Sequence, residues 1–288
     1  MIKKVLEVAV VLMLIAFSFY YTDKAVAIVE QNDPIMKQIN QQSAQYEEMA
    51  VDATIDEKYM IPGYSGLMVN TEESFQKMKQ YGDYNESLFV FQEVEPAISI
   101  EEYYDRYISS GNGFTDNVAL VFKVDTLDYL QEVATILEKT DARATFFIDG
   151  ILLEDHAAEI QALAADFHEI EILDYDGGYD KISFLGSLEK LKVLTNTAGK
   201  YCYAEYDQKE ILTMCQEQKL HTIIPTMKIT NNAYRTIKGN IKSGTIISFD
   251  LNKENVDELS VVIQYIKQRG FVLDTLDNLL QEGRGLEK

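Results

Sequence analysis

Acidic side chains recur where predicted strands end in the C-terminal half of the chain. The carboxyl ends of parallel strands meet at one edge, which is where such folds bind ligands. Carboxylates in this position predict either an oxygen-ligated Ca²⁺ or Mg²⁺ site or acids that cap the following helices and stay solvated. The capping interpretation is favoured, so no cofactor is predicted. The acids are Asp125, Asp149, Asp174, Asp176, Glu205, Asp207 and Asp250.

Sulfur and imidazole groups are few. The chain has two cysteines, Cys202 and Cys215, and three histidines, His156, His168 and His221. Their spacing is not that of zinc ligands, so no zinc site is predicted and each histidine is interpreted as structural. The cysteines form either a disulfide, if the chain is exported, or two buried thiols. Two buried thiols are the favoured interpretation, because one cysteine falls in a predicted strand and the other in the middle of a predicted helix.

The overall charge is strongly negative. The 288 residues carry a formal net charge of -21, and 47% of them are hydrophobic. This hydrophobic fraction can supply a folded core. An acidic surface repels the phosphate backbone, so nucleic acid is excluded as a partner.

An apolar segment stands near the N-terminus. Residues 5–21 read VLEVAVVLMLIAFSFYY and follow Lys3 and Lys4. The length is close to the lower limit for a bilayer-spanning helix, and the lysines favour an N-terminus on the cytoplasmic side. The sequence Ala25-Val26-Ala27 also allows cleavage as a signal peptide. An uncleaved anchor with the body on the extracytoplasmic face is favoured over secretion after cleavage near Ala27.

Residues 28–113 are predicted to form an extracytoplasmic stalk of mixed α+β structure. Asp33-Pro34 has the pattern of a helix N-cap followed by a first-turn proline. A second helix is expected at 71–81 with Thr71 as its cap, then a strand at 88–91 and a helix at 99–108. The tyrosines near the end of this region are interpreted as packing residues rather than a sugar-stacking surface.

Strands and helices alternate from residue 117 to about 280. This alternation predicts parallel strands covered by helices, and about seven units predict a TIM-like, incomplete (β/α)7 barrel. The expected strands are 118–124, 144–148, 168–173, 201–206, 221–225, 244–249 and 271–273. The expected helices are 128–139, 155–167, 184–194, 208–218 and 256–268.

Four segments in this region resemble motifs of the NodB-type polysaccharide deacetylase domain, a carbohydrate esterase. They are ARATFFIDG, HEIEILDY, SGTIISFD and RGFVLDTLDNLL. The resemblance implies a deacetylase-like barrel. The predicted parts of the chain are therefore an anchor or signal peptide at 1–27, the stalk at 28–113, the barrel at 117–280 and a tail at 281–288.

The resemblance also implies where catalytic groups should lie. In that family a base aspartate, a metal-binding aspartate, two histidine ligands and an acid histidine act around a divalent cation. These five positions fall on Lys123, Val124, Leu173, Gly177 and Phe249. Three of these side chains are apolar, one is absent and one is cationic, so no metal ligand is predicted. Lys123, near the end of an apolar strand, is expected to pair with a nearby acid.

The favoured function is that of an inactive, membrane-anchored envelope protein that binds a cell-wall glycan or an envelope partner. The alternative is an active hydrolase of C–N amide bonds in N-acetylated envelope polysaccharide, with a displaced metal site. A structural scaffold that works through its stalk is a weaker alternative. The candidate ligand-binding residues are Asp125, Asp149, Asp174, Asp176, Glu205, Asp250, Tyr175 and Tyr206.

Overall fold

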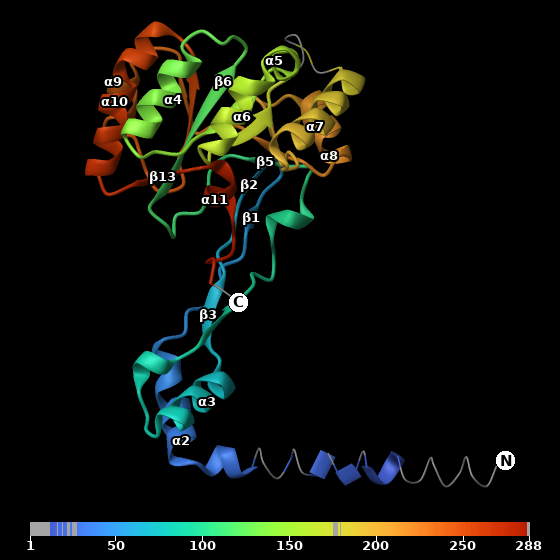
Figure 1. Ribbon diagram of the computed structural model, residues 1–288, viewed down its shortest axis with the longest axis vertical. Helices are drawn as coiled ribbons and strands as arrows, with labels where there is room; N and C mark the ends of the chain where they lie inside the picture. The colour runs from blue at the N-terminus through green and yellow to red at the C-terminus, as the bar shows by residue number, and fades with distance from the viewer. Residues whose placement is uncertain are drawn as a thin grey trace, which may run out of the picture. The chain divides into compact units, whose positions relative to one another are not determined.

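The computed structural model describes residues 12–15, 17, 18, 20, 21, 24, 28–174, 178 and 180–286. The chain separates into two compact units (Figure 1). The small unit comprises Met1–Met49, Gly66–Val94 and Gly285–Lys288, and the large unit comprises Ala50–Ser65 and Glu95–Arg284. Residues 28–113, predicted as one stalk, are divided between these two units.

The predicted membrane anchor lies partly outside the described residues. No helix in the described part of the chain is both long and apolar enough to span a membrane. Several described apolar side chains of this stretch are exposed, among them Leu12 at 61% and Tyr21 at 63%. The anchor therefore stays a prediction from the sequence.

Two helices and a two-stranded antiparallel sheet make up the core of the small unit. Asp33 caps the first helix as predicted, because its side chain accepts a hydrogen bond from the Ile35 N–H at 2.9 Å. The helix predicted at 71–81 is confirmed, but its cap is Asn70 rather than Thr71. The elements are α2 (Pro34–Gln42), η1 (Ser43–Gln45), β3 (Gly66–Val69), α3 (Thr71–Tyr81), η2 (Glu86–Leu88) and β4 (Phe91–Val94). Their apolar faces enclose Met36, Ile39, Val69, Phe75, Met78 and Phe89.

Parallel strands form the centre of the large unit, which confirms the α/β prediction. The strands predicted as one barrel are divided between two hydrogen-bonded sheets. One sheet has the order β11-β12-β6-β7-β8, with β13 also pairing with β6, and all its ladders are parallel. Its strands are β6 (Asn117–Val124), β7 (Thr145–Ile148), β8 (Glu169–Ile172), β11 (Met227–Ile229), β12 (Ile246–Asp250) and β13 (Val272–Asp274).

The second sheet uses strands from the region predicted as stalk. Its order is β1-β2-β5-β10-β9, and all its ladders are parallel except that between β1 and β2. The predicted helix at 99–108 is wrong: a short 3-10 helix, η3 (Ile100–Glu102), precedes β5, and Tyr107 is almost fully buried. Tyr107 therefore packs in the core, as predicted for the tyrosines of this region. The strands are β1 (Thr54–Ile55), β2 (Tyr59–Ile61), β5 (Tyr107–Ile108), β9 (Tyr201–Tyr203) and β10 (His221–Ile223).

Helices cover the sheets in two groups. In Figure 1, α4, α9 and α10 gather on one side of β6, and α5, α6, α7 and α8 gather on the other. The single helix predicted at 155–167 is two helices, because Asp149 caps an earlier start and the chain breaks at His156. The helices are α4 (Leu130–Lys139), α5 (Gly150–Asp155), α6 (Ala157–Ala165), α7 (Lys181–Thr195), α8 (Lys209–Glu217), α9 (Ala233–Ile237), α10 (Lys253–Gln268) and α11 (Leu276–Leu280).

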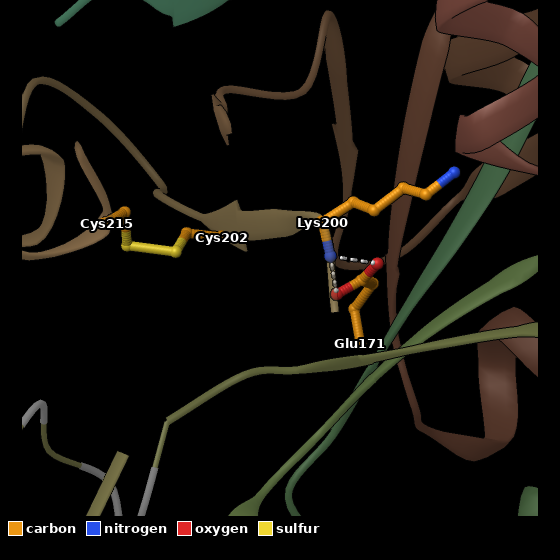
Figure 2. Close-up of a disulfide and its surroundings, with 4 residues drawn as sticks. All are labelled: Glu171, Lys200, Cys202 and Cys215. Carbon is orange, nitrogen blue, oxygen red and sulfur yellow. Dashed lines mark hydrogen bonds between the residues drawn. A yellow bond between two sulfur atoms is a disulfide. The ribbon is translucent and has the colours of Figure 1, made fainter. Parts of the chain in front are cut away.

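A disulfide joins β9 to α8. Cys202 and Cys215 are bonded, and both side chains are fully buried. Figure 2 shows the bond along β9 from Lys200, which precedes the strand. The favoured interpretation of two free thiols is therefore wrong. Sequence spacing did not reveal that α8 folds back against β9 with the two Cα atoms 6.4 Å apart.

Candidate functional site

Lys123 occupies the centre of the site that the deacetylase resemblance predicts. It is the second-last residue of β6, and its direct partner in the neighbouring β12 is Asp250. The ammonium Nζ lies 2.7 Å from Asp250 Oδ1 and 2.7 Å from Glu205 Oε1. Glu205 follows β9 of the second sheet and Asp250 is the last residue of β12 in the first, so this cation joins acids from the two sheets. The predicted pairing of Lys123 with a nearby acid is confirmed.

The ion pairs set the charge state of these groups. Burial alone would lower the pKa of the Lys123 ammonium, but its hydrogen bonds to Asp250 and Glu205 raise that pKa above the usual value. The same hydrogen bond from Lys123 lowers the pKa of Glu205. Lys123 and Glu205 are therefore charged at neutral pH, and the ammonium stands between two carboxyl groups.

Apolar side chains fill the other described positions of the predicted metal site. Val124 is fully buried, and Leu173 is 9% exposed. Phe249 is buried and stacks on Phe122 with ring centroids 5.5 Å apart. Gly177, the fifth position, lies outside the described residues. The described positions thus present aliphatic and aromatic carbon where two metal ligands and the catalytic acid would be required.

The acids at the strand ends have separate roles. Asp149 caps α5 by accepting a hydrogen bond from the Ile151 N–H at 2.8 Å, as the capping interpretation predicts. Asp207 is not the cap of α8, whose N-cap is Gln208; it pairs with Lys58 at 2.5 Å. Asp125 is exposed.

Asp174 follows β8, and its carbonyl oxygen accepts a hydrogen bond from the Gly150 N–H at 2.8 Å. Asp176 and Tyr175 lie outside the described residues. Across the part of the chain that the structure describes, no three His, Cys, Asp or Glu side chains are grouped so that they could hold a metal ion. Among the expected acids that the structure describes, Glu205 and Asp250 are brought together around Lys123.

Two polar side chains beside Lys123 were not predicted from the sequence. The hydroxyl groups of Tyr203 and Ser248 share a hydrogen bond of 2.9 Å, and Lys123 Nζ lies 5.9 Å from the centre of the Tyr203 ring. Burial raises the pKa of Tyr203 to about 12, so the phenol stays neutral. Both residues lie in strands that are predicted from their apolar composition. A single hydroxyl group in such a strand does not indicate which residue it will bond.

These residues do not fit a catalytic divalent cation. A deacetylase of this type needs carboxylate and imidazole ligands to polarise an amide carbonyl and activate water. Here an ammonium stands at the base position, and Val124, Leu173 and Phe249 cannot ligate a cation or transfer a proton. The arrangement can bind polar groups through Glu205, Asp250 and the exposed ring of Tyr206, which is 64% exposed.

Comparison with known sequences gives one relative over most of the chain. No protein-family model matches. The uncharacterized protein YlxY of Bacillus subtilis strain 168 is 26% identical over 281 residues, which cover 91% of this chain and 88% of that protein. The likeness therefore extends over both units.

Comparison with solved structures identifies the fold. BA3943 of Bacillus anthracis, a pseudoenzyme of the CE4 family, matches with a TM-score of 0.69 and 21% identity, covering 88% of this chain and 97% of that one. A BA3943 mutant with restored enzymatic activity also matches with a TM-score of 0.69. The Bc1960 peptidoglycan N-acetylglucosamine deacetylase matches with a TM-score of 0.56 and 20% identity, covering 64% of this chain and 97% of that one. The chain therefore has the fold of the CE4 polysaccharide deacetylases.

Proposed function

We propose that this chain is a catalytically inactive, polysaccharide-deacetylase-like protein of the cell envelope that binds a glycan or an envelope protein. The position of Lys123 Nζ, 2.7 Å from both Glu205 and Asp250, carries the proposal. A cation in this site would meet an ammonium group rather than a free carboxylate. The likeness to a CE4 pseudoenzyme supports the same conclusion.

An active hydrolase with a displaced metal site is less well supported. Glu205 and Asp250 are engaged by Lys123, and Asp149 is engaged as a helix cap. A relocated metal would have to separate an existing ion pair or uncap α5. Either change costs stability before any ligand is gained.

Metal analysis and acetate release test the absence of activity. The purified full-length chain should bind no stoichiometric Zn²⁺ or Co²⁺ and should release no acetate from N-acetylglucosamine oligomers. Bc1960 serves as the active control of the same fold. The variant Lys123→Asp should also stay inactive, because Val124 and Leu173 still supply no ligand. Metal-dependent acetate release by the wild-type chain would overturn the proposal.

Glycan binding is proposed at the edge that carries Tyr206. An exposed aromatic ring beside carboxylates is a surface on which a sugar ring can stack and donate hydrogen bonds. Tyr206→Ala should reduce co-sedimentation of the chain with insoluble peptidoglycan. Tyr81→Ala in the small unit is the matched control, because Tyr81 is 65% exposed. Equal retention of both variants, or no retention of the wild type, would count against a glycan at this edge.

We also propose that the body of the protein lies outside the cytoplasm, held by residues 5–21. The support is the apolar run after Lys3 and Lys4, with exposed side chains such as Leu12, and the buried disulfide, which is typical of an oxidising compartment. Membrane fractionation and N-terminal sequencing distinguish an intact anchor from cleavage near Ala27. Recovery in the cytosol with free, acid-trapped thiols would contradict both forms of export.

A further inference from the structure

A cavity of about 290 Å³ lies in the large unit at the amino-terminal end of β8. Its walls come from the start of β8, the segment that leads from α7 into β9, and the start of α11. Lys123 lies near the carboxyl end of β6, so this cavity is separate from the deacetylase-like site. The volume suits one small molecule.

Two glutamates on one face of β8 form part of the cavity wall. Glu169 and Glu171 alternate along the strand, so their side chains point to the same side. Both oxygens of Glu171 accept hydrogen bonds from the Lys200 main-chain N–H, at 3.0 and 3.1 Å (Figure 2). Glu169 Oε2 accepts from Thr145 Oγ1 at 2.6 Å and from the Asp277 N–H at 3.2 Å. Each of these donors is a neutral group.

Neither glutamate has a direct ion-pair partner among the described residues. Within the described residues, no lysine or arginine nitrogen lies within 4.0 Å of either carboxylate. Figure 2 shows the Lys200 side chain extending away from Glu171, and its Nζ pairs with Asp277 Oδ1 at 2.6 Å. Burial raises the pKa of Glu169 to about 7 and that of Glu171 well above its usual value. The glutamates therefore have no direct ion-pair partner, and the charge of Lys200, which also lines the cavity, offsets the effect of burial on Glu169 only in part.

An unsatisfied histidine lines the same cavity. His168 is 8% exposed, and no described residue forms a hydrogen bond with its Nδ1. Burial lowers the pKa of His168, so the ring is neutral at neutral pH. The nearby Arg143 guanidinium lies over the Phe167 ring, 5.5 Å from its centroid. His168, Glu169 and Glu171 thus all line this cavity, with the two glutamates on one face of β8.

We propose that this cavity binds a small molecule that carries a primary ammonium group and a hydroxyl group, with the ammonium against Glu169. An ammonium offers three donors and one positive charge, and it would supply the direct ion-pair contact that Glu169 does not have among the described residues. Glu169 is the contact residue because it is only partly buried, whereas Glu171 is 2% exposed. The hydroxyl groups of Thr195 and Thr197, which also line the cavity, can bond a ligand hydroxyl.

Calorimetric titration of the full-length chain with ethanolamine tests the proposal. Ethylene glycol is the matched control ligand, because a hydroxyl replaces the ammonium. Ethanolamine should bind more tightly at pH 8 than at pH 6, since Glu169 loses its proton across this range while the ligand amine stays protonated. Glu169→Gln should weaken binding at pH 8 by about tenfold or more, as expected for the loss of a hydrogen bond to a charged group.

The control variant is Glu189→Gln, an exposed glutamate on α7 that should leave binding unchanged. If Glu169→Gln fails to fold, NMR chemical-shift mapping of the wild-type chain with ethanolamine shows where the ligand binds. Shifts centred on His168 and Thr197 support the site. Equal binding of ethylene glycol, unchanged binding by Glu169→Gln, or shifts centred elsewhere would overturn it. None of these results depends on whether the chain deacetylates or binds glycans.

Discussion

Carboxylates bridge the two sheets of the large unit at two places, and the two places are electrostatically opposite. At the carboxyl ends of the strands, Lys123 of β6 forms ion pairs with Glu205, which follows β9, and with Asp250. Toward the amino-terminal end, Glu171 of β8 accepts hydrogen bonds from the Lys200 main-chain N–H just before β9. The first bridge has a cation, and the second has only neutral donors.

The partner decides whether the carboxylate favours its charged form. The ammonium of Lys123 lowers the pKa of Glu205. Burial, followed by the neighbouring Glu169, raises the pKa of Glu171. The bridge at the carboxyl ends of the strands is thus stabilised by ion pairs. The bridge toward the amino-terminal end is stabilised when its glutamates are protonated. A site occupied by the Lys123 ion pairs at one end and an acceptor-rich cavity at the other are the structural result.

Removing the disulfide tests how far both bridges depend on β9. The double variant Cys202→Ala/Cys215→Ala should lose about 3 kcal/mol of unfolding free energy, as expected for a closed loop of about this length. Urea denaturation measures the change, and the reduced wild-type protein is the control. Because β9 connects Lys200 to Glu205, both bridges should loosen together. An unchanged midpoint would show that α8 holds β9 without the covalent bond.

The charge-poor bridge should make the protein more stable in acid. The pKa of Glu169 is about 7 in the folded chain and about 4.5 in the unfolded chain, so folding is favoured when this group is protonated. This contribution is full below pH 4.5 and is lost as the pH rises through 7. Glu169→Gln should therefore gain about 2–3 kcal/mol relative to wild type at pH 8 and little at pH 4.5. Thermal unfolding between pH 4.5 and pH 8 measures this effect, with Glu189→Gln as the control. If Glu169→Gln and the control both kept the wild-type dependence of stability on pH, the raised pKa of Glu169 would be contradicted.

The sequence predicts the charged bridge better than the neutral one. Lys123 stands in an apolar strand close to predicted strand ends rich in acid, and a buried lysine needs an acidic partner. The α/β class follows from the regular alternation of strand and helix patterns, and the position of the site follows from the deacetylase resemblance. Glu169 and Glu171 also carry a signal, since two glutamates alternate with isoleucines in a strand predicted to be buried. Their pKa values depend on which hydrogen-bond donors and charges the fold places nearby. The alternation of residue types within the strand does not predict those neighbours.

Short strands cannot be predicted from the sequence pattern in the same way. β5 has two residues and β11 has three, so neither is long enough to show an alternation of apolar and polar residues. Each forms because it can hydrogen-bond with a neighbouring strand, β10 or β12. The predicted helix that includes Tyr107 failed for this reason. The disulfide was also missed, because thirteen residues of separation are compatible with many geometries.

Breaking the charged bridge should cost less than removing the disulfide. Lys123→Met leaves Glu205 and Asp250 near one another without their shared cation. The carboxylates are 48% and 37% exposed, so solvent screens part of the repulsion, and the expected loss is about 2 kcal/mol at neutral pH. Lys139→Met, at an exposed position on α4, is the control. An effect no larger than the control would mean that the pair contributes nothing to stability.

The smallest expected effect comes from the hydroxyl pair beside Lys123. Tyr203→Phe removes one partner of a buried hydrogen bond and leaves Ser248 Oγ without it, which should cost about 1 kcal/mol. The aromatic face beside the ammonium is kept, so Lys123 should remain paired. NMR titration of Glu205 checks this, because its pKa should stay below the usual value in Tyr203→Phe and return toward it in Lys123→Met. A Glu205 pKa that rises equally in both variants would mean that the hydroxyl pair, rather than the ring, holds Lys123 in place.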